Sequence, residues 1–409
     1  MKQALLLAYH FPPHAGSSGP QRTLRFAQYL PSFGWEPHIL TAHPRAYPET
    51  SAASLSQVPP DLEVLRAPAW DTARHFSLLG RYPRMAALPD RWVSWWPGAV
   101  LLGLRAIRRL RPQVIWSTYP IATAHLIGAT LHRLTGIPWV ADFRDPMISQ
   151  DYPTDPAMVR SFARIERLAA RHAAQCVFTT HSAVAHMAAA YPETAARCCC
   201  IENGYDEGAF QGLDPGLPPL NPGRFTLLHS GIVYPSERDP TALFQALRDL
   251  IDRRVVDPAA LCVRFRASMH DRHLQALIDR FNLVECVELA PPLPYREALQ
   301  EMIRADTLLL LQASNCNTQV PAKLYEYLRA HRPILALTDP AGATAQTLAT
   351  LNSDNLVRWD DPKAIADLLT EWMAGQYPIR KATPDAIASA SREGRTRQLA
   401  GVFDRVTAP

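Results

Sequence analysis

The residues that could do chemistry are charged side chains in loops that follow apolar runs. Lys323 and Glu326 lie three residues apart in a segment that is typical of a short helix opened by Pro321. Arg238 precedes a second predicted helix, and Asp142 ends another apolar run. Cations beside helix N-termini suit an anion such as a phosphate. The sequence has no pair of carboxylates arranged as in a glycoside hydrolase, so the predicted chemistry is phosphate binding and charge stabilisation.

Each of these features also has a simpler interpretation. Lys323 and Glu326 are compatible with an exposed ion pair on an ordinary amphipathic helix. Asp239 could be a plain helix cap with Arg238 solvated, and the segment Asp142–Asp145 could be a structural clasp between acid and arginine. The surrounding elements decide between these alternatives.

The first half of the chain predicts a parallel α/β layer. Ala4–Tyr9 is a continuous apolar run, as expected for a strand covered on both faces. A loop over 10–19 follows, then a helix opened by Pro20 and a strand over Pro37–Thr41. The loop contains neither a GxGxxG fingerprint nor a Walker lysine, so it does not favour a dinucleotide-binding or P-loop protein.

A second α/β series follows a linker rich in glycine and proline. We predict an N-terminal Rossmann-like acceptor domain over 1–207, a linker over 208–223, a C-terminal Rossmann-like donor domain over 224–383, and a C-terminal helix over 384–409 that packs back on the first domain. The fold class is therefore α/β, with two parallel-sheet domains facing a cleft. Open parallel sheets bind ligands at the carboxyl ends of their strands, where the charged loops lie.

Composition limits the function classes. The chain has 409 residues, 47% of them hydrophobic and 20% charged, which is typical of two globular domains. Its seven cysteines form no CxxC pair, and we expect reduced thiols in a cytoplasmic protein without a metal site. The apolar run near the N-terminus is too short for a signal peptide or a membrane span.

Charge is spread unevenly along the chain. The net charge is +4, but residues 81–111 hold seven arginines and a single acid, Asp90. Three tryptophans lie in the same segment: Trp92, Trp95 and Trp96. Arginines attract anionic headgroups and tryptophans favour the membrane interface, which predicts peripheral contact with the inner face of a membrane. The alternative is a solvated basic face with the tryptophans in the core; nucleic-acid binding fits less well, because the basic residues are confined to one segment.

Five motifs occur in an order that carries a family resemblance. They are AYHFPPHAGSSGPQRTLRFAQYLPSFGWEPHILT at the start, DFRDP, IENGYD, HSG with ERDP, and VPAKLYEYLRAHRPILAL. The chain resembles the retaining glycosyltransferases of the GT-B fold, in the broad family 4 group that uses nucleotide sugars. The resemblance covers most of the chain. It implies a glycosyltransferase of the hexosyltransferase type, which needs no cofactor beyond its nucleotide-sugar co-substrate.

The resemblance also implies site residues. Glu326 matches the family glutamate that accepts hydrogen bonds from the ribose of the donor, and Arg238 lies near the position of the cation that binds the diphosphate. The residues predicted to be catalytic are Arg238, Lys323 and Asp142. Those predicted to bind the donor are Glu326, Ser230, Gly231, Arg238, Val320, Pro321, Lys323 and Thr318, with His229 lining the nucleotide side. Those predicted for an acceptor or phosphate loop are Gly16, Ser17, Ser18, Gly19, Arg22, Arg144 and Asp145.

The chain departs from the family pattern at two positions. Thr318 stands where the family has a second glutamate, with seven residues between it and Glu326, so a carboxylate often assigned to the donor sugar is missing. Ile232 stands where an arginine usually follows Gly231. We therefore expect transfer with retention to a glycan or lipid-linked acceptor, in the synthesis of a cell-surface polysaccharide or glycolipid. A nucleotide-sugar epimerase on the same scaffold and a non-catalytic nucleotide-sugar-binding protein are the alternatives.

Overall fold

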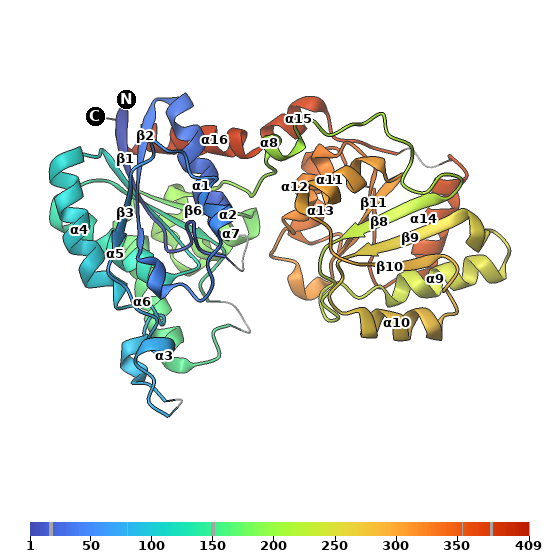
Figure 1. Cartoon of the computed structure of the whole chain (residues 1–409), viewed down its shortest axis with the longest axis horizontal. Helices are drawn as coiled ribbons and strands as arrows, with labels where there is room; N and C mark the ends of the chain where they lie inside the picture. The colour runs from blue at the N-terminus through green and yellow to red at the C-terminus, as the bar shows by residue number, and fades with distance from the viewer. Residues whose placement is uncertain (16–18, 80, 149–151, 354, 377–378, 409) are drawn as a thin grey trace. The chain divides into compact units, whose positions relative to one another are not determined.

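The computed structural model describes residues 1–15, 19–79, 81–148, 152–353, 355–376 and 379–408. The chain divides into two compact units, which Figure 1 shows in colours that follow the sequence. Unit 1 comprises Met1–Asn203 and Arg392–Pro409, and unit 2 comprises Gly204–Ser391. The two α/β parallel-sheet domains predicted from the sequence are confirmed, one in each unit.

Unit 1 is built on a seven-stranded sheet in the order β3-β2-β1-β4-β5-β6-β7, with every pairing parallel. The strands are β1 (Lys2–Leu7), β2 (Trp35–Ala42), β3 (Val64–Ala67), β4 (Val114–Thr118), β5 (Trp139–Arg144), β6 (Gln175–Phe178) and β7 (Cys198–Cys200). The helices are α1 (Gly19–Tyr29), α2 (Ala52–Leu55), α3 (Thr72–His75), α4 (Trp95–Leu110), α5 (Ala122–Thr135), α6 (Pro156–His172), α7 (His181–Ala190) and α16 (Arg392–Val406).

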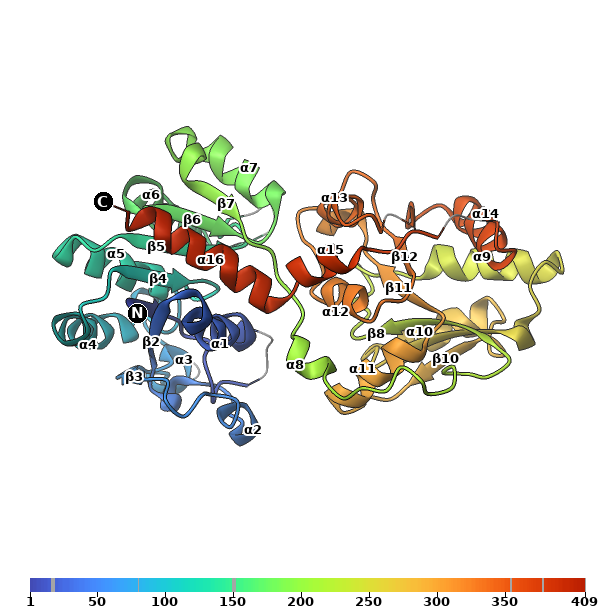
Figure 2. The same ribbon diagram turned by 90° about the horizontal axis from the view of Figure 1, so that it is seen from above.

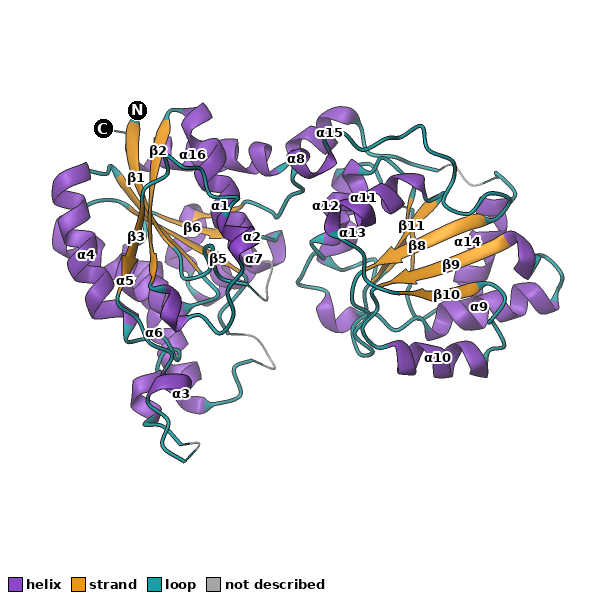
Figure 3. Ribbon diagram, in the orientation of Figure 1, coloured by secondary structure: helices purple, strands orange, loops and turns teal. Residues whose placement is uncertain are grey.

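Helices cover both faces of this sheet, as Figure 3 shows. One face packs against α4, α5 and α6, and the other packs against α1 and α16. The last helix, α16, runs across the second face in Figure 2, where Phe403 packs edge-on against the ring of Trp35 at 5.3 Å. Burial on both faces explains why β1 and β4 read as continuous apolar runs.

Unit 2 has a six-stranded parallel sheet in the order β10-β9-β8-β11-β12-β13. The strands are β8 (Phe225–Ser230), β9 (Leu261–Arg266), β10 (Val287–Ala290), β11 (Thr307–Leu311), β12 (Ile334–Leu337) and β13 (Leu356–Val357). The helices are α8 (Glu207–Phe210), α9 (Thr241–Asp252), α10 (Asp271–Arg280), α11 (Tyr295–Arg304), α12 (Lys323–Arg329), α13 (Ala343–Thr350), α14 (Pro362–Met373) and α15 (Pro384–Ser389).

The segment over 208–223, predicted as a linker, lies within unit 2. Phe210 is buried in the unit's core, and the backbone N–H of Leu220 donates to the carbonyl of Arg304 at 3.0 Å. The functional division into an acceptor domain and a donor domain stays a prediction.

Candidate functional site

The predicted donor residues gather at one place in unit 2. The strand order reverses between β8 and β11, and ligands of open α/β sheets bind at such a switch point, beyond the carboxyl ends of the strands. The loop after β8 carries Gly231 and Arg238, and the loop after β11 leads into α12 with Lys323 and Glu326. A backbone hydrogen bond from Ala313 N to the Glu237 carbonyl, 2.7 Å long, joins the two loops.

The central contact of this site joins Lys323 to His229. The lysine Nζ lies 2.9 Å from Nε2 of the imidazole, whose Nδ1 lies 3.0 Å from the carbonyl oxygen of Leu309. Since a carbonyl only accepts, Nδ1 carries the proton, and Nε2 is left as the acceptor for the lysine. The histidine therefore holds the lysine side chain in place.

Burial governs the charge of both groups. Burial, and then the charge of Lys323, lowers the pKa of His229 well below its usual value, so the imidazole is neutral. Burial, and then the nearby Arg238, lowers the pKa of Lys323 well below its ordinary value, whereas Glu326 acts in the opposite direction. Two cationic side chains close together in a desolvated site favour a bound anion.

Gly231 makes room for the lysine. Its backbone has φ +104°, a conformation that residues with a Cβ rarely adopt, and a Cβ at this position would lie 3.3 Å from Nζ of Lys323. A glycine is therefore required both by the turn after β8 and by the side chain beside it.

Arg238, in the loop after β8, lies at the same end of the sheet as Lys323. Its guanidinium donates to the Ile232 carbonyl and lies over the Tyr234 ring, 5.1 Å from the ring centroid. These contacts hold the side chain close to Lys323. A small hollow beside it is lined by Glu237, Arg238, Gln312, Cys316, Gln319 and Pro321.

Two tyrosines complete the site, and the sequence analysis did not assign a functional role to either. The Tyr295 hydroxyl donates to Oε1 of Glu326 at 2.7 Å, which fixes the carboxylate. The Tyr327 hydroxyl accepts a hydrogen bond from the backbone N–H of Ser230 at 2.8 Å. Tyr327 is fully buried in the core of unit 2. No sequence signal marks Tyr295, which lies 31 residues from its partner.

The start of α12 differs from the sequence prediction. The helix begins at Lys323, so Pro321 does not open it. Pro321 instead supplies the carbonyl that accepts from Leu324 N at 3.0 Å, in a turn just before the helix. Because α12 has only seven residues, we do not assign anion binding to its N-terminus. Val320 packs against the core, and Thr318 is exposed in the loop before the helix. Neither side chain is charged, so the charge at this site comes from Lys323, Arg238 and Glu326.

In unit 1, Asp142 and Arg22 pair with each other. Arg22 Nε donates to one carboxylate oxygen at 2.8 Å and Nη2 donates to the other at 3.3 Å; Asp142 is fully buried and Arg22 is 7% exposed. The same guanidinium donates to the carbonyls of Ile201 and Glu202. The carboxylate is therefore engaged in a structural ion pair, and the catalytic role expected of Asp142 stays a prediction. Arg22 likewise joins α1 to β5 and the end of β7.

Arg144 and Asp145 lie at the carboxyl end of β5. Arg144 has φ +62° beside an irregularity in the β5–β6 pairing, and it donates to Thr118 Oγ1 and to the Gly19 carbonyl, both at 3.1 Å. Burial lowers its pKa to about 10. Asp145 is exposed and accepts from Thr179 Oγ1 at 3.3 Å. Of the predicted loop, Gly19 begins α1, and Gly16, Ser17 and Ser18 lie outside the described residues.

Comparison with known proteins identifies the family. Residues 19–204 match the family model of the glycosyl transferase 4-like domain. The protein is a glycosyltransferase with a glycosyl transferase 4-like domain. The resemblance to nucleotide-sugar-dependent GT-B enzymes of the family 4 type is therefore confirmed. No curated protein matches the sequence.

Solved structures share the fold of this glycosyltransferase over almost its whole length. A glycosyltransferase from Rickettsia africae matches with a TM-score of 0.63 at 12% identity, covering 99% of this chain and 98% of that chain. HepE from Anabaena, solved in complex with UDP, matches with a TM-score of 0.59 at 14% identity, covering 98% and 95%. A UDP-N-acetylglucosamine 2-epimerase matches with a TM-score of 0.53 at 12% identity, covering 98% and 94%. These likenesses show the GT-B fold alone.

The described part of the glycosyltransferase holds neither a cluster of metal ligands nor a membrane-spanning helix. Among the described residues, no group of three or more histidine, cysteine, aspartate or glutamate side chains could hold a metal ion. Within the same part of the chain, no helix is both long enough and apolar enough to cross a membrane.

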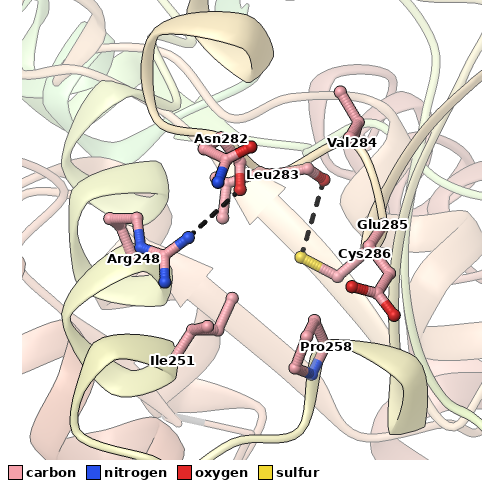
Figure 4. Close-up of a pocket in the computed structure, with 8 residues that line it drawn as sticks. All are labelled: Arg248, Ile251, Pro258, Asn282, Leu283, Val284, Glu285 and Cys286. Atoms are coloured by element: carbon pink, nitrogen blue, oxygen red, sulfur yellow. Dashed lines mark hydrogen bonds between the residues drawn. The ribbon is translucent and has the colours of Figure 1, made fainter.

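A further hollow of the glycosyltransferase lies away from the switch point. Figure 4 shows it between the C-terminal half of α9 and the residues that precede β9 and β10; Arg248 donates across it to the Asn282 carbonyl at 3.2 Å. Its volume is about 140 Å³. Since it lies at the amino ends of the strands and contains none of the predicted site residues, it is not the candidate site.

The tryptophans of 81–111 do not form one exposed group. Trp95 is fully buried in the core of unit 1, and the indole N–H of Trp92 donates inward to the Ala46 carbonyl at 3.2 Å. Trp96 is 37% exposed. For Trp95 the structure agrees with the alternative of a tryptophan in the core, and the membrane contact of residues 81–111 stays a prediction.

Proposed function

We propose that the protein transfers a sugar, with retention of configuration, from a nucleotide-diphosphate sugar to a glycan or lipid-linked acceptor in cell-surface polysaccharide or glycolipid synthesis. The observation that carries this proposal is the buried Lys323 beside Arg238, with the carboxylate of Glu326 one helical turn from the lysine. The cations suit a diphosphate and the carboxylate suits ribose hydroxyl groups. That combination matches a nucleoside diphosphate.

In the proposed chemistry, the enzyme stabilises the leaving group. As the bond between the anomeric carbon and the phosphate oxygen breaks, negative charge develops on the diphosphate, and Lys323 and Arg238 stabilise it. Losing one such preorganised donor typically costs about 3–4 kcal/mol of transition-state stabilisation. The acceptor oxygen forms the new glycosidic bond on the same face and gives its proton to the departing phosphate oxygen. No enzyme nucleophile takes part, in keeping with the structural position of Asp142.

Uridine diphosphate is the first nucleotide to test. HepE was solved with UDP, and it shares the fold of this chain at 14% identity. Glu326, fixed by Tyr295, would accept from the ribose, and Ser230 and Gly231 would line the diphosphate side. Val320, Pro321 and Thr318 would border the site through the loop before α12.

The acceptor would belong to unit 1. Arg144, Asp145 and Gly19 meet at the carboxyl end of β5, where a parallel sheet binds ligands. We place the enzyme in the cytoplasm, peripheral on the inner face of the membrane, through the basic segment 81–111 and its neighbours.

Two other functions remain as outcomes of the test. An epimerase that acts on nucleotide sugars shares the fold, and the threonine at position 318 would also suit a protein that binds nucleotide sugars without transferring them. Incubation with a panel of nucleotide sugars and membrane extract separates the three. Release of nucleoside diphosphate with a sugar added to the acceptor supports transfer. Interconversion of the sugar without release would show an epimerase, and binding with neither reaction would show a binding protein.

A further inference from the structure

The segment between β3 and α4 carries exposed apolar side chains on a projection of unit 1. In Figure 1 it is drawn as α3 and the turn that follows, at the lower end of this unit. Five large apolar residues within ten positions are exposed, and we call them the apolar tip: Phe76 (49%), Leu78 (78%), Leu79 (96%), Tyr82 (39%) and Met85 (80%). Exposed apolar groups so close together mark a contact with something other than water.

The backbone of the tip suits an apolar environment. Leu78 N donates to the Arg81 carbonyl at 2.8 Å, and Arg81 N donates back to the Leu78 carbonyl at 3.0 Å. This reciprocal pair satisfies four backbone groups of Leu78 and Arg81, and Leu79, the residue after Leu78, has φ +50°. Backbone groups that are already paired can enter a lipid interface without the cost of an unsatisfied donor or acceptor.

The positive charge around the apolar tip indicates that the surface it would contact is anionic. Residues 72–89 contain three arginines and neither aspartate nor glutamate. One of them, Arg84, pairs with Asp155, whereas Arg81 lies at the turn itself. Apolar side chains flanked by arginines fit a bilayer with anionic headgroups. The apolar side chains enter the lipid, and the headgroups attract the arginines. A second copy of this chain would instead bring the same positive charge against the tip.

We propose that the apolar tip inserts into the headgroup region of an anionic membrane and that Arg81 contacts the lipid phosphates. The inference rests on the proposed function, since a lipid-linked acceptor places the enzyme at a membrane. It also moves the contact from the tryptophans of 81–111 to residues 76–85. Trp96 lies at the start of α4, close in sequence to the tip, whereas Arg105 and Arg108 lie toward the opposite end of that helix.

Vesicle flotation of the full chain tests the proposal without any donor sugar. Vesicles of phosphatidylcholine with roughly 30% phosphatidylglycerol are compared with vesicles of phosphatidylcholine alone. The first composition carries enough anionic lipid to attract basic segments. Leu78→Ser with Leu79→Ser should lower the partition coefficient on anionic vesicles roughly 100-fold, about tenfold for each leucine withdrawn from lipid. Arg81→Gln should lower it roughly fivefold on anionic vesicles and leave neutral vesicles unaffected.

The matched control is Leu134→Ser. Leu134 is 60% exposed near the end of α5, outside the apolar tip, and its replacement should leave flotation unchanged. Equal flotation of the wild type and the Leu78/Leu79 variant, or an equal loss in the Leu134 variant, would overturn the proposal. So would a change of oligomeric state in the tip variant, measured by sedimentation, without a change in lipid binding.

Failure of this inference and failure of the proposed function give different results. The tip variant should keep wild-type rates of sugar transfer to a detergent-solubilised acceptor. Loss of flotation with retained transfer supports the tip, and flotation by a protein without transferase activity would refute only the proposed function.

Discussion

Nζ of Lys323 lies 2.9 Å from the acceptor nitrogen of a neutral His229, across the point where the strand order of unit 2 reverses. The imidazole accepts a hydrogen bond from the lysine and adds no charge. The hydrogen bond leaves Lys323 as the group that would take up a proton when an anion binds.

Binding of a nucleoside diphosphate should be coupled to proton uptake at Lys323. Burial and Arg238 lower the pKa of the empty site's lysine, and a bound diphosphate would raise it again, because it favours the charged form. The affinity for UDP should therefore fall as pH rises from the pKa of the empty site toward that of the bound site. Calorimetry at pH 8 in buffers of different ionisation enthalpy should show net proton uptake, since the phosphate itself is fully ionised there.

Lys323→Gln provides the control for proton uptake. The glutamine cannot titrate, so uptake should vanish and UDP affinity should fall at least tenfold. Undiminished uptake in this variant would assign the proton to another group.

Gly231→Ala should impair donor binding more than stability. The added Cβ would lie 3.3 Å from Nζ of Lys323 in a backbone with φ +104°. We expect UDP affinity to fall at least tenfold, with a stability loss of about 1–2 kcal/mol from the left-handed backbone. Gly223→Ala is the matched control, because Gly223 has φ +84° in the same unit with no atom within 4 Å of its Cβ position. If both variants lose affinity equally, the contact with Lys323 has no role.

Replacing Asp142 should destabilise unit 1. Asp142→Ala leaves Arg22 buried without its partner, and breaking such a pair typically costs about 3–5 kcal/mol. Chemical denaturation should show that loss, whereas kcat per folded molecule should change little. A stable Asp142 variant that had lost its activity would instead support the catalytic role expected from the sequence.

Glu166 should make stability depend on pH. Burial raises its pKa from 4.5 to about 7, against hydrogen bonds from the backbone N–H groups of Met147 and Ile148. The folded state therefore holds its proton more tightly than the unfolded state, and the stability contribution of this group falls as pH rises from about 4.5 to about 7. In the wild type this group should lower the free energy of unfolding by about 3 kcal/mol between those pH values, and Glu166→Gln should remove that fall. Denaturant unfolding measured at each pH tests this. An unchanged pH profile in the variant would place the titration elsewhere.

The sequence predicted the sheets and the loops of the site better than their side-chain contacts. Apolar runs such as Ala4–Tyr9 mark strands buried on both faces, and the strands end in the loops that carry Lys323 and Arg238. The pairing of Asp142 with Arg22 spans 120 residues, and no local spacing indicates it. The hydrogen bond from Tyr295 to Glu326 also joins separate helices.

Other differences arose because local propensity was overridden by packing. The sequence left open whether Trp95 lies at a membrane or in the core, and packing places its ring in the core. Pro321 was expected to open α12 and forms the turn before it.

Donor kinetics of Glu326→Ala test the central claim most directly. Sugar transfer from the preferred nucleotide sugar is measured for the wild type, Glu326→Ala and Tyr295→Phe, after unfolding measurements show that each variant is folded. We predict at least a tenfold loss of kcat/KM for the donor in Glu326→Ala, because the ribose loses its acceptor. Tyr295→Phe should show a smaller loss, because only the orientation of the carboxylate is relaxed. Unchanged donor kinetics in folded Glu326→Ala would contradict the assignment of this site.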